Sequence, residues 1–258
     1  HLAMPVCVVN SFIAHPPVGG GGPPTADLVS DFDPAGGCYS DLLGLNLCTN
    51  TESVRTWVPG GSAPTSGTAT QSDAGDRPTW FAADGDGDPY VDFNGSGEYM
   101  NLAGSSFLYR NSDMSIYCVK DNGPSPGSFD CIFCKTASYN WDLGWIIGAN
   151  SSNDFRTCIN EYPAGEIVNT AGGSTKEVGT FRFKTSAEPR YNQSRINNNT
   201  DQSGTTQTSN DAPGKDALLG ASWNSGGSGA TFTYDGRLYR LLIYKTYHSD
   251  SEATDIIS

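Results

Sequence analysis

The sequence is poor in positive charge. Its 258 residues carry 15 Lys and Arg against 28 Asp and Glu, which gives a formal net charge of −13. Proteins that bind nucleic acid through its phosphates need clustered Lys and Arg, so this balance argues against a nucleic-acid partner. It also disfavours adsorption to an anionic membrane surface.

Long apolar runs are missing as well. No stretch approaches the ~20 consecutive apolar residues that a membrane-spanning helix needs, so no membrane insertion is expected. Leu, Lys and Glu are scarce, whereas Gly, Ser, Thr, Asn and Asp are abundant. This composition favours turns and strands over helices.

Catalytic patterns are the third absence. The only histidines are His1, His15 and His248, so few residues could serve as the base of a Ser-His-Asp triad. Neither a G-x-S-x-G motif nor a Walker loop occurs. A glycosidase needs two carboxyls facing each other across the sugar, and no two glutamates stand at a matching strand spacing. We expect no catalysis, and a glycan-active hydrolase is kept only as an alternative.

Short alternating segments, separated by Gly, Asp and Asn turns, make up most of the chain. The stretch from Asp76 to Leu102 contains three of them, and further ones recur about every ten residues. Such spacing predicts an antiparallel β-sandwich or barrel. The expected strands are Leu28–Phe32, Ser53–Val58, Thr79–Ala82, Tyr90–Phe93, Tyr99–Leu102, Ser115–Lys120, Phe129–Lys135, Leu143–Ile147, Phe155–Ile159, Glu166–Asn169, Gly179–Lys184, Arg190–Ile196, Asp216–Ala221, Ala230–Phe232 and Arg237–Tyr244.

The two ends of the chain differ from this body. Residues 1–26 combine a short β-prone segment, Val6 to Ile13, with the Pro/Gly tract HPPVGGGGPP, which acts as a spacer. They are predicted to be an extended arm, either an edge strand of the domain or a docking element that adds a strand to a partner. Residues 27–258 are predicted to be one domain. At its end, Ser249 and Glu252 match a capping box that opens a short helix ending near Ile257.

The seven cysteines are an odd number, so at least one thiol is free or pairs with another chain. Cys38 and Cys48 bracket a small loop and are the best candidates for a disulfide. Cys131 and Cys134 form a C-x-x-C, but no second pair and no nearby His completes a zinc site. Two unrelated strand cysteines are the simpler interpretation.

Four pieces of the sequence resemble the concanavalin A-like lectin/glucanase superfamily, and within it the laminin-G-like (LamG) jelly rolls. They are RPTW followed by a Gly/Asp turn and YVDFNGSGEYMNL, the strand Met114–Lys120, the segment WDLGWIIG (Trp141–Gly148), and DGRLYRLLIYKTYHSDSE (Asp235–Glu252). The resemblance covers roughly Asp27 to Ser258. It implies an all-β fold, a two-sheet antiparallel jelly-roll β-sandwich with a short C-terminal helix behind the extended N-terminal arm.

The resemblance also implies carbohydrate or protein ligands, and often a calcium ion at the sandwich rim. Two function classes follow from it. The first is a non-catalytic binding or adhesion module on a cell or particle surface that recognises carbohydrate. The second is a structural virion component, a phage capsid-decorating or tail protein, anchored through its arm to a capsid, tail or surface protein. In both, the chain works outside the cell or on a virion, and the arm could support a homo-oligomer.

The sequence DGDGD offers a candidate calcium site. Asp84, Asp86 and Asp88 alternate on a glycine-loosened loop, and calcium binds several hard oxygen ligands on a backbone that can wrap around it. The alternative is an ordinary exposed turn, because Asp and Gly are turn residues.

Aromatic residues beside polar ones offer a candidate sugar platform. Trp141 and Trp145 are four residues apart, so a continuous strand would point them to the same face. The alternative is core packing, because large aromatics dominate sandwich cores. The full candidate set is Tyr139, Asn140, Trp141, Asp142, Trp145, Trp223 and Asn224.

Overall fold

The protein is described by a computed structural model. The residues that the structure describes are 26–60, 67–108, 112–123, 127, 129–136, 144–159, 166–170, 176–185, 191–197, 199–205, 214–224 and 228–257. The predicted arm therefore lies almost wholly outside the described residues, and its roles in docking and in oligomer formation stay predictions. So does the domain boundary between residues 26 and 27.

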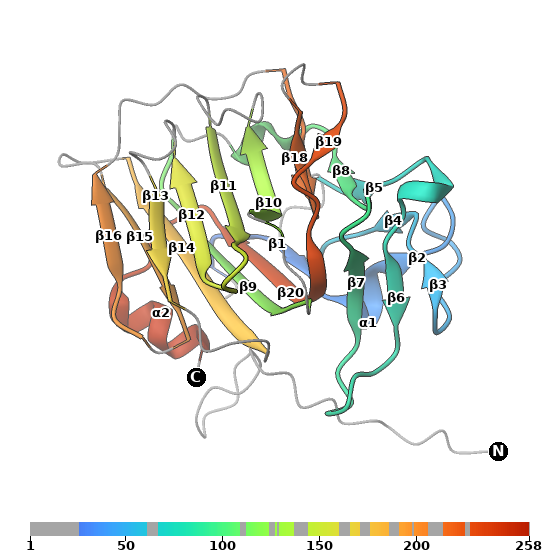
Figure 1. Ribbon diagram of the computed structural model, residues 1–258, viewed down its shortest axis with the longest axis horizontal. Helices are drawn as coiled ribbons and strands as arrows, with labels where there is room; N and C mark the ends of the chain where they lie inside the picture. The colour runs from blue at the N-terminus through green and yellow to red at the C-terminus, as the bar shows by residue number, and fades with distance from the viewer. Residues whose placement is uncertain are drawn as a thin grey trace.

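Within the described residues, the strands form two antiparallel nine-stranded sheets that face each other, which confirms the expected sandwich (Figure 1). In the first sheet the order is β16-β15-β14-β9-β20-β7-β6-β3, and β1 pairs with β20. Its strands are β1 Leu28–Phe32, β3 Glu52–Ser53, β6 Thr79–Phe81, β7 Tyr90–Asn94, β9 Met114–Asn122, β14 Glu177–Lys184, β15 Tyr191–Ile196, β16 Gln202–Thr205 and β20 Asp235–Tyr244.

The second sheet has the order β13-β12-β11-β10-β17-β8-β5-β4-β2. A separate hairpin joins β18 Ser222–Trp223 to β19 Ala230–Thr231. The strands of the second sheet are β2 Cys38–Tyr39, β4 Thr56–Trp57, β5 Ala69–Thr70, β8 Met100–Leu102, β10 Asp130–Thr136, β11 Gly144–Ala149, β12 Phe155–Ile159, β13 Glu166–Asn169 and β17 Ala217–Leu219.

The main core lies between the sheets. Alternate residues of each strand point inward, so Phe93 of β7 and Leu241 of β20 meet Phe133 and Trp145 of the second sheet in one buried cluster. One expected strand is wrong: the segment Ser53–Val58 is split. Its start pairs as β3 with β6 in the first sheet, and its middle pairs as β4 in the second.

Helix α2 (Asp250–Ile257) covers the outer face of the first sheet (Figure 1). Its buried Ala253, Ile256 and Ile257 join a cluster with Tyr117 and Tyr244. The capping box forms as predicted, because the Ser249 amide donates to Glu252 Oε2 at 2.7 Å and the Glu252 amide donates to Ser249 Oγ at 3.4 Å.

The remaining described helices are single turns. They are α1 (Pro34–Gly37) and the 3₁₀ turns Ala74–Asp76 and Ser105–Leu108. None of the helices in the described ranges has the length and apolar character needed to cross a membrane.

Candidate functional site

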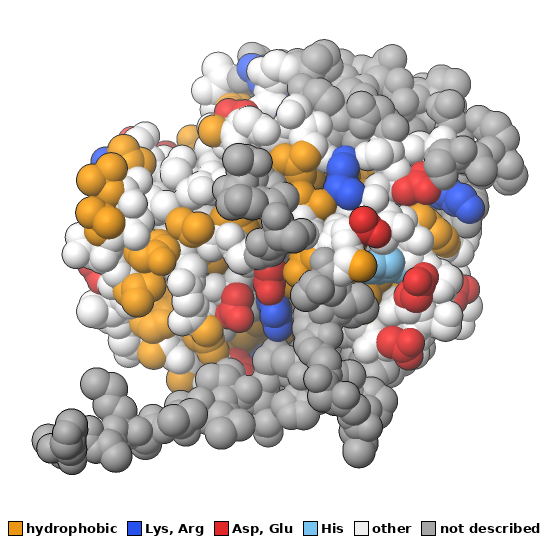
Figure 2. All heavy atoms as spheres, turned by 180° about the vertical axis from the view of Figure 1, so that it is seen from behind, with side chains coloured by type: hydrophobic (Ala, Val, Ile, Leu, Met, Phe, Trp, Pro, Cys, Tyr) orange, Lys and Arg blue, Asp and Glu red, His pale blue; other side chains and the backbone are white. Residues whose placement is uncertain are grey.

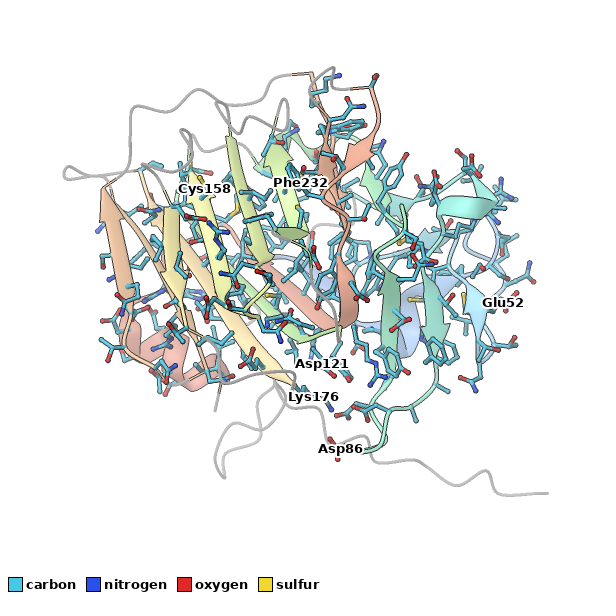
Figure 3. The ribbon with its side chains drawn as sticks, viewed as in Figure 1. Glu52, Asp86, Asp121, Cys158, Lys176 and Phe232 are labelled. Atoms are coloured by element: carbon cyan, nitrogen blue, oxygen red, sulfur yellow. The ribbon has the colours of Figure 1, made fainter. Side chains whose placement is uncertain are left out.

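The DGDGD turn carries a lysine where the sequence predicts a calcium ion. Lys176 Nζ lies 2.9 Å from Asp84, 3.6 Å from Asp86 and 2.6 Å from Asp88, and it lies over the Tyr239 ring at 4.4 Å (Figure 3). Burial alone would raise the pKa of Asp84, but hydrogen bonds from Lys176 and from backbone amides lower it overall. Among the described residues, no group of three or more His, Cys, Asp or Glu side chains is arranged to hold a metal ion.

We therefore expect a chelator, or added calcium, to leave the melting temperature of the protein unchanged. A bound ion would stabilise the folded state by mass action, but here the Lys176 ammonium occupies the space between the carboxylates and offsets part of their charge. Lys176→Met should cost about 1 kcal/mol, because the three carboxylates then repel one another. Thermal melts with EDTA and with calcium, on both proteins, measure this. A chelator-induced drop in the wild type would confirm the calcium prediction, which stays open until then.

The predicted disulfide is not formed in the structure, where Cys38 and Cys48 are buried free thiols. The two residues are nevertheless neighbours, because the Cys48 amide donates to the Cys38 carbonyl at 2.9 Å. Burial, together with the nearby acidic Glu52, raises the pKa of Cys48 to about 12, so this thiol stays protonated and unreactive at neutral pH.

The predicted aromatic platform is only partly described. Tyr139, Asn140, Trp141 and Asp142 lie outside the described residues. Trp145 is 1% exposed, and its Nε1 donates to the Leu108 carbonyl at 3.1 Å, so assigning it to an exposed platform is wrong. Its ring belongs to the core because it lies on the inner face of β11, between the two sheets.

Trp223 and Asn224 lie together on the β18–β19 hairpin. The half-buried Trp223 ring donates from Nε1 to the Asp216 carbonyl at 2.9 Å, and Lys215 lies over it at 5.3 Å. The backbone amide of Asn224 donates to the Gly229 carbonyl, and the side-chain Oδ1 of Asn224 accepts from the backbone amide of Ser228. Asn224 thus shapes the turn of the hairpin, and a ligand role for either residue stays a prediction.

A polar groove lies beyond this hairpin, on the ends of three neighbouring strands. β20 pairs with both β7 and β9, so that Arg237 stands opposite Asp92 on one side and Asp121 on the other. Residues opposite each other point to the same face of a sheet. One row of side chains therefore carries a carboxylate, a guanidinium and a second carboxylate. We call the pockets built on and beside this row the acidic groove.

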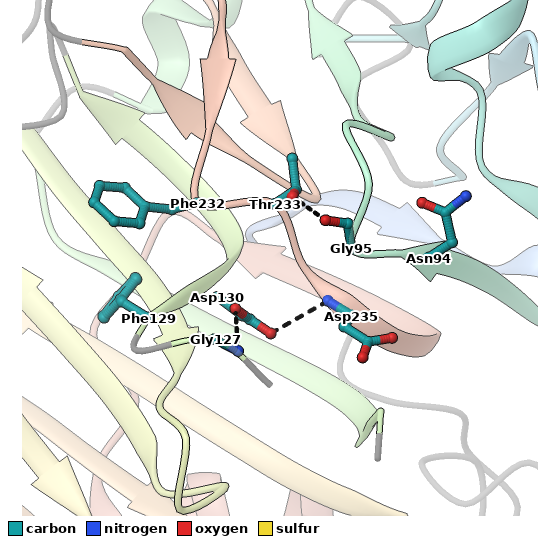
Figure 4. A pocket seen from close by; sticks show the side chains of 8 residues that line it. All are labelled: Asn94, Gly95, Gly127, Phe129, Asp130, Phe232, Thr233 and Asp235. Atoms are coloured by element: carbon teal, nitrogen blue, oxygen red, sulfur yellow. Dashed lines mark hydrogen bonds between the residues drawn. The ribbon is translucent and has the colours of Figure 1, made fainter. Parts of the chain in front are cut away.

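The first pocket of the groove has a volume of about 390 Å³ (Figure 4). Asp130 fixes its floor: Oδ1 accepts from the Gly127 amide at 2.8 Å and Oδ2 from the Asp235 amide at 3.4 Å. On its wall, Thr233 donates to the Gly95 carbonyl at 2.6 Å. The lining residues are Asn94, Gly95, Gly127, Phe129, Asp130, Phe232, Thr233 and Asp235.

Two aromatic rings close one side of this pocket. Phe129 and Phe232 meet edge to face at 6.2 Å, and the Arg156 guanidinium lies over Phe129 at 5.3 Å. Phe232 has φ +49°, a left-handed conformation that is unusual for a bulky side chain and costs roughly 1–2 kcal/mol. Such strain concentrates at functional sites, and here it holds a half-buried ring at the pocket wall.

The second pocket adjoins the first, shares Asn94 and Asp235 with it, and has a volume of about 450 Å³. A glycine stands at its edge, close to Asp235: a Cβ on Gly123 would lie 2.4 Å from the Asp235 carboxyl carbon, so a larger residue would displace that carboxylate. Its lining residues are Asp92, Asn94, Asp121, Asn122, Gly123, Asp235, Gly236 and Arg237.

Charge in the groove is unbalanced. Four aspartates face one arginine among the lining residues, and Arg237 stands 3.8 Å from both Asp92 and Asp121. Burial raises the pKa of Asp92, Asp121 and Asp130, and the neighbouring Asp235 adds to the rise at Asp92 and Asp130. Carboxylates that have lost water, with little counter-charge, attract hydrogen-bond donors.

Glu98 holds Asn94, a residue that lines both pockets of the groove. It accepts from the Asn94 amide at 2.9 Å and from Asn94 Nδ2 at 2.8 Å, and burial raises its pKa to about 7. In the unfolded chain a glutamate has a pKa of about 4.3. The folded state therefore disfavours the ionised form, and stability is lost as the pH rises from about 4.3 through about 7.

We expect the free energy of unfolding to fall by roughly 2 kcal/mol more in the wild type than in Glu98→Gln between pH 4 and pH 8. Other raised carboxyls of the groove contribute to both proteins alike, so the difference between the two pH profiles isolates Glu98. Urea unfolding across this pH range measures it. Parallel profiles would contradict the assignment.

A second surface is apolar. Leu42, Leu43, Leu45 and Leu47 are between 52% and 78% exposed, beside the β2–β4 edge, where hydrophobic side chains gather in the rear view (Figure 2). The loop is ordered by Asp41, whose carboxylate accepts from the amides at positions 43, 45 and 46. Large contiguous apolar patches on protein surfaces often mark interaction sites.

Sequence reasoning missed both the groove and the leucine loop. Alternation in YVDFN and DGRLY places Asp92, Asp235 and Arg237 outward, but it does not say which strands are neighbours. The leucines stand out in the sequence only as the interior of a cysteine loop. The run LLGLNL, with no charge among its apolar residues, was the signal available for them.

No family model matches this sequence, and no curated protein matches it. Solved structures do match. The CBM40 module of Ruminococcus gnavus IT-sialidase, bound to α2,3-sialyllactose, aligns with TM-score 0.54 at 10% identity, over 66% of this chain and 96% of that one. The leech intramolecular trans-sialidase aligns with a TM-score of 0.52 at 14% sequence identity, and Trypanosoma rangeli sialidase aligns with a TM-score of 0.58 at 10% identity.

The alignment with the leech enzyme covers 65% of this chain and 27% of that one, and the alignment with the trypanosomal enzyme covers 92% and 34%. The chain thus spans about a third or less of either sialidase. Sequence identities this low are evidence for a shared fold, and they say nothing about the position of a binding site. The alignments agree with the predicted jelly-roll β-sandwich, and membership of the concanavalin A-like superfamily and of its laminin-G branch stays a prediction. By fold, this chain is a jelly-roll β-sandwich of the kind found in sialidases and their CBM40 modules.

Proposed function

We propose that the protein is a non-catalytic carbohydrate-binding module, and that the acidic groove is its binding site. The observation that carries the proposal is the combination in one pocket of a strained aromatic ring, Phe232, with the oxygens of Asp130 and Asp235. Sugars present C–H faces that pack on aromatic rings, and hydroxyls that donate to carboxylates. Pockets of a few hundred Å³ with a few convergent polar groups are typical ligand sites.

The fold supports the same conclusion. The CBM40 module that aligns with this chain is described in complexes with α2,3- and α2,6-sialyllactose. A sandwich that binds glycans works where glycans are displayed, so the module is proposed to act outside the cell or on a particle surface. Attachment to a capsid, tail or surface protein through the arm remains the alternative role from the sequence.

A glycan array probed with the full chain tests the proposal, followed by titration calorimetry on the best ligand. Phe232→Gly removes the ring and also relieves the left-handed backbone, so it should keep the melting temperature while weakening binding about tenfold or more. Phe232→Tyr should retain binding. Tyr39→Ala, in β2 at the far edge of the second sheet, is the aromatic control and should bind normally.

The proposal fails if no glycan binds, or if the bound glycan is indifferent to Phe232→Gly and to Asp235→Asn. The same samples test for catalysis. A glycosidase places two carboxyls on opposite sides of the bond it breaks, and the groove contains several. Recovered ligand should be intact by mass spectrometry after prolonged incubation, and cleaved ligand would make the chain a hydrolase.

A further inference from the structure

The leucine loop, Leu42–Leu47, presents its apolar side chains on a rigid frame. The Asp41 carboxylate accepts from the amides at positions 43, 45 and 46, and the Asp41 carbonyl accepts from Thr56 Oγ1 at 2.7 Å. The Ser40 amide also donates to the Asn46 carbonyl at 2.9 Å. Leucines held in this way lose little further conformational freedom when they are covered, so a contact here costs less entropy than one made by a loose loop.

The outer edge of the second sheet lies in the same loop. Tyr39 of β2 forms an antiparallel bridge with Leu47, and the pairs on either side bond through the Asn46 carbonyl and the Cys48 amide. In such a ladder the residue between two bonded pairs directs its own N–H and C=O away from the neighbouring strand. These two groups of Leu47 make no hydrogen bond with any part of the chain that the structure describes. The edge can therefore pair with one more strand.

The charges that would keep other molecules off this edge are missing. Proteins protect open edges with Lys or Pro, and neither residue occurs between Cys38 and Thr51. Asp41 is the one charged residue in that stretch, and its carboxylate is hydrogen-bonded to the loop amides. A contact made here buries apolar side chains at little cost in desolvated charge.

The size and the edge of this surface fit a second copy of the chain. Four leucines that are each more than half exposed present on the order of 500 Å² of mostly apolar surface (Figure 2). Two such surfaces face to face would bury about 1,000 Å², the size of weak, reversible protein complexes. An edge strand also pairs antiparallel with its own two-fold copy, so that each Leu47 bonds the N–H and C=O of the other. A lipid surface offers no partner for these backbone groups.

We infer that the protein forms a two-fold dimer through the leucine loop, in which the two Leu47 backbones pair and the leucines of both copies interlock. The inference goes beyond the proposed function and does not rest on it, because no residue of the loop lines the acidic groove. Each copy carries a formal net charge of −13, so the two copies repel one another. The dimer should therefore tighten as added salt screens that repulsion.

Sedimentation equilibrium on the full chain tests the inference. A reducing agent is present throughout, so that cross-links between cysteines cannot produce a dimer. Over a concentration range of roughly 1 to 300 µM, the chain should pass reversibly from monomer to dimer, with a dissociation constant on the order of 10–100 µM. Raising the salt concentration should lower this constant about threefold.

Variants locate the contact. Leu43→Ser combined with Leu45→Ser should raise the dissociation constant about tenfold or more. These two side chains are 78% and 74% exposed in the single chain, so the double variant should keep its melting temperature within about 2 °C. Val168→Ser is the matched control. It removes an exposed apolar side chain from β13, at the opposite edge of the same sheet, and should leave the dissociation constant unchanged.

Three results would overturn the inference, and each leaves the proposed function standing. A chain that stays monomeric over the whole concentration range does not form the dimer. A dimer that survives the double serine variant is held together elsewhere, as in the predicted assembly through residues 1–26. If the monomer instead floats with phosphatidylcholine vesicles, and the double serine variant does not, then the leucine loop is a lipid-binding surface.

Discussion

Replacing Lys120 with methionine should cost about 3–5 kcal/mol of the free energy of unfolding, because it leaves a buried carboxylate without its counter-charge. Lys120 Nζ lies 2.9 Å from Glu177 Oε2, and the two side chains are 0% and 2% exposed. They stand opposite each other on β9 and β14. Alternation from Ile116 and Cys118 of the main core places the pair on the inner face of the sheet.

The reason for so large an effect is an asymmetry. When the wild type folds, the Lys120 ammonium and the Glu177 carboxylate both lose their hydrating water and gain their mutual attraction in a medium of low dielectric. These two contributions to the free energy of unfolding nearly cancel, so the intact pair adds little net stability. In Lys120→Met, Glu177 keeps the desolvation cost and loses the attraction of the Lys120 ammonium. Replacing both residues with apolar ones removes both the desolvation cost and the ionic attraction. The free energy of unfolding of Lys120→Met with Glu177→Leu should therefore lie within about 1 kcal/mol of the wild-type value, or above it.

Urea unfolding with linear extrapolation measures these differences, and the double variant shows that the site tolerates apolar side chains. A single variant as stable as the wild type would mean that water or another group reaches Glu177. If Lys120→Met does not fold at all while the double variant does, the loss of the Lys120 counter-charge at Glu177 is still identified as the cause.

Sequence pattern predicted the long strands well and the short ones poorly. Strands such as β9 and β20 alternate over many residues, so the period of two is visible. β2 and β5 contain two residues each and have no period to detect. They are strands only because a partner lies beside them, and pairing is decided by the whole fold. The prediction for Ser53–Val58 is wrong for the same reason.

The candidate site was less predictable than the fold. Asp92, Asp121 and Arg237 are far apart in sequence, and the register of β20 against β7 and β9 brings them into one row. Residue types alone favoured Asp84–Asp88 as the cation site. They could not reveal that Lys176, far along the chain, would lie among those carboxylates.

Trp145→Ala should be the most damaging aromatic substitution among the residues first considered for sugar binding, at about 3–5 kcal/mol. The ring packs edge to face on Phe133 at 5.1 Å and lies 6.2 Å from Phe181 and 6.5 Å from Phe183 of the opposite sheet. It therefore joins the two layers of the sandwich. Its removal leaves a cavity that strands on both sides hold open.

Trp145→Phe separates packing from recognition. It keeps a ring between the sheets and gives up part of the volume and the hydrogen bond to Leu108, so we expect a loss of about 1–2 kcal/mol. Glycan binding by Trp145→Phe should equal that of the wild type, whereas Phe232→Gly should lose binding and keep stability. If the reverse holds, with Trp145→Phe stable and unable to bind, then the tryptophan platform predicted from the sequence is the true site and the acidic groove is not.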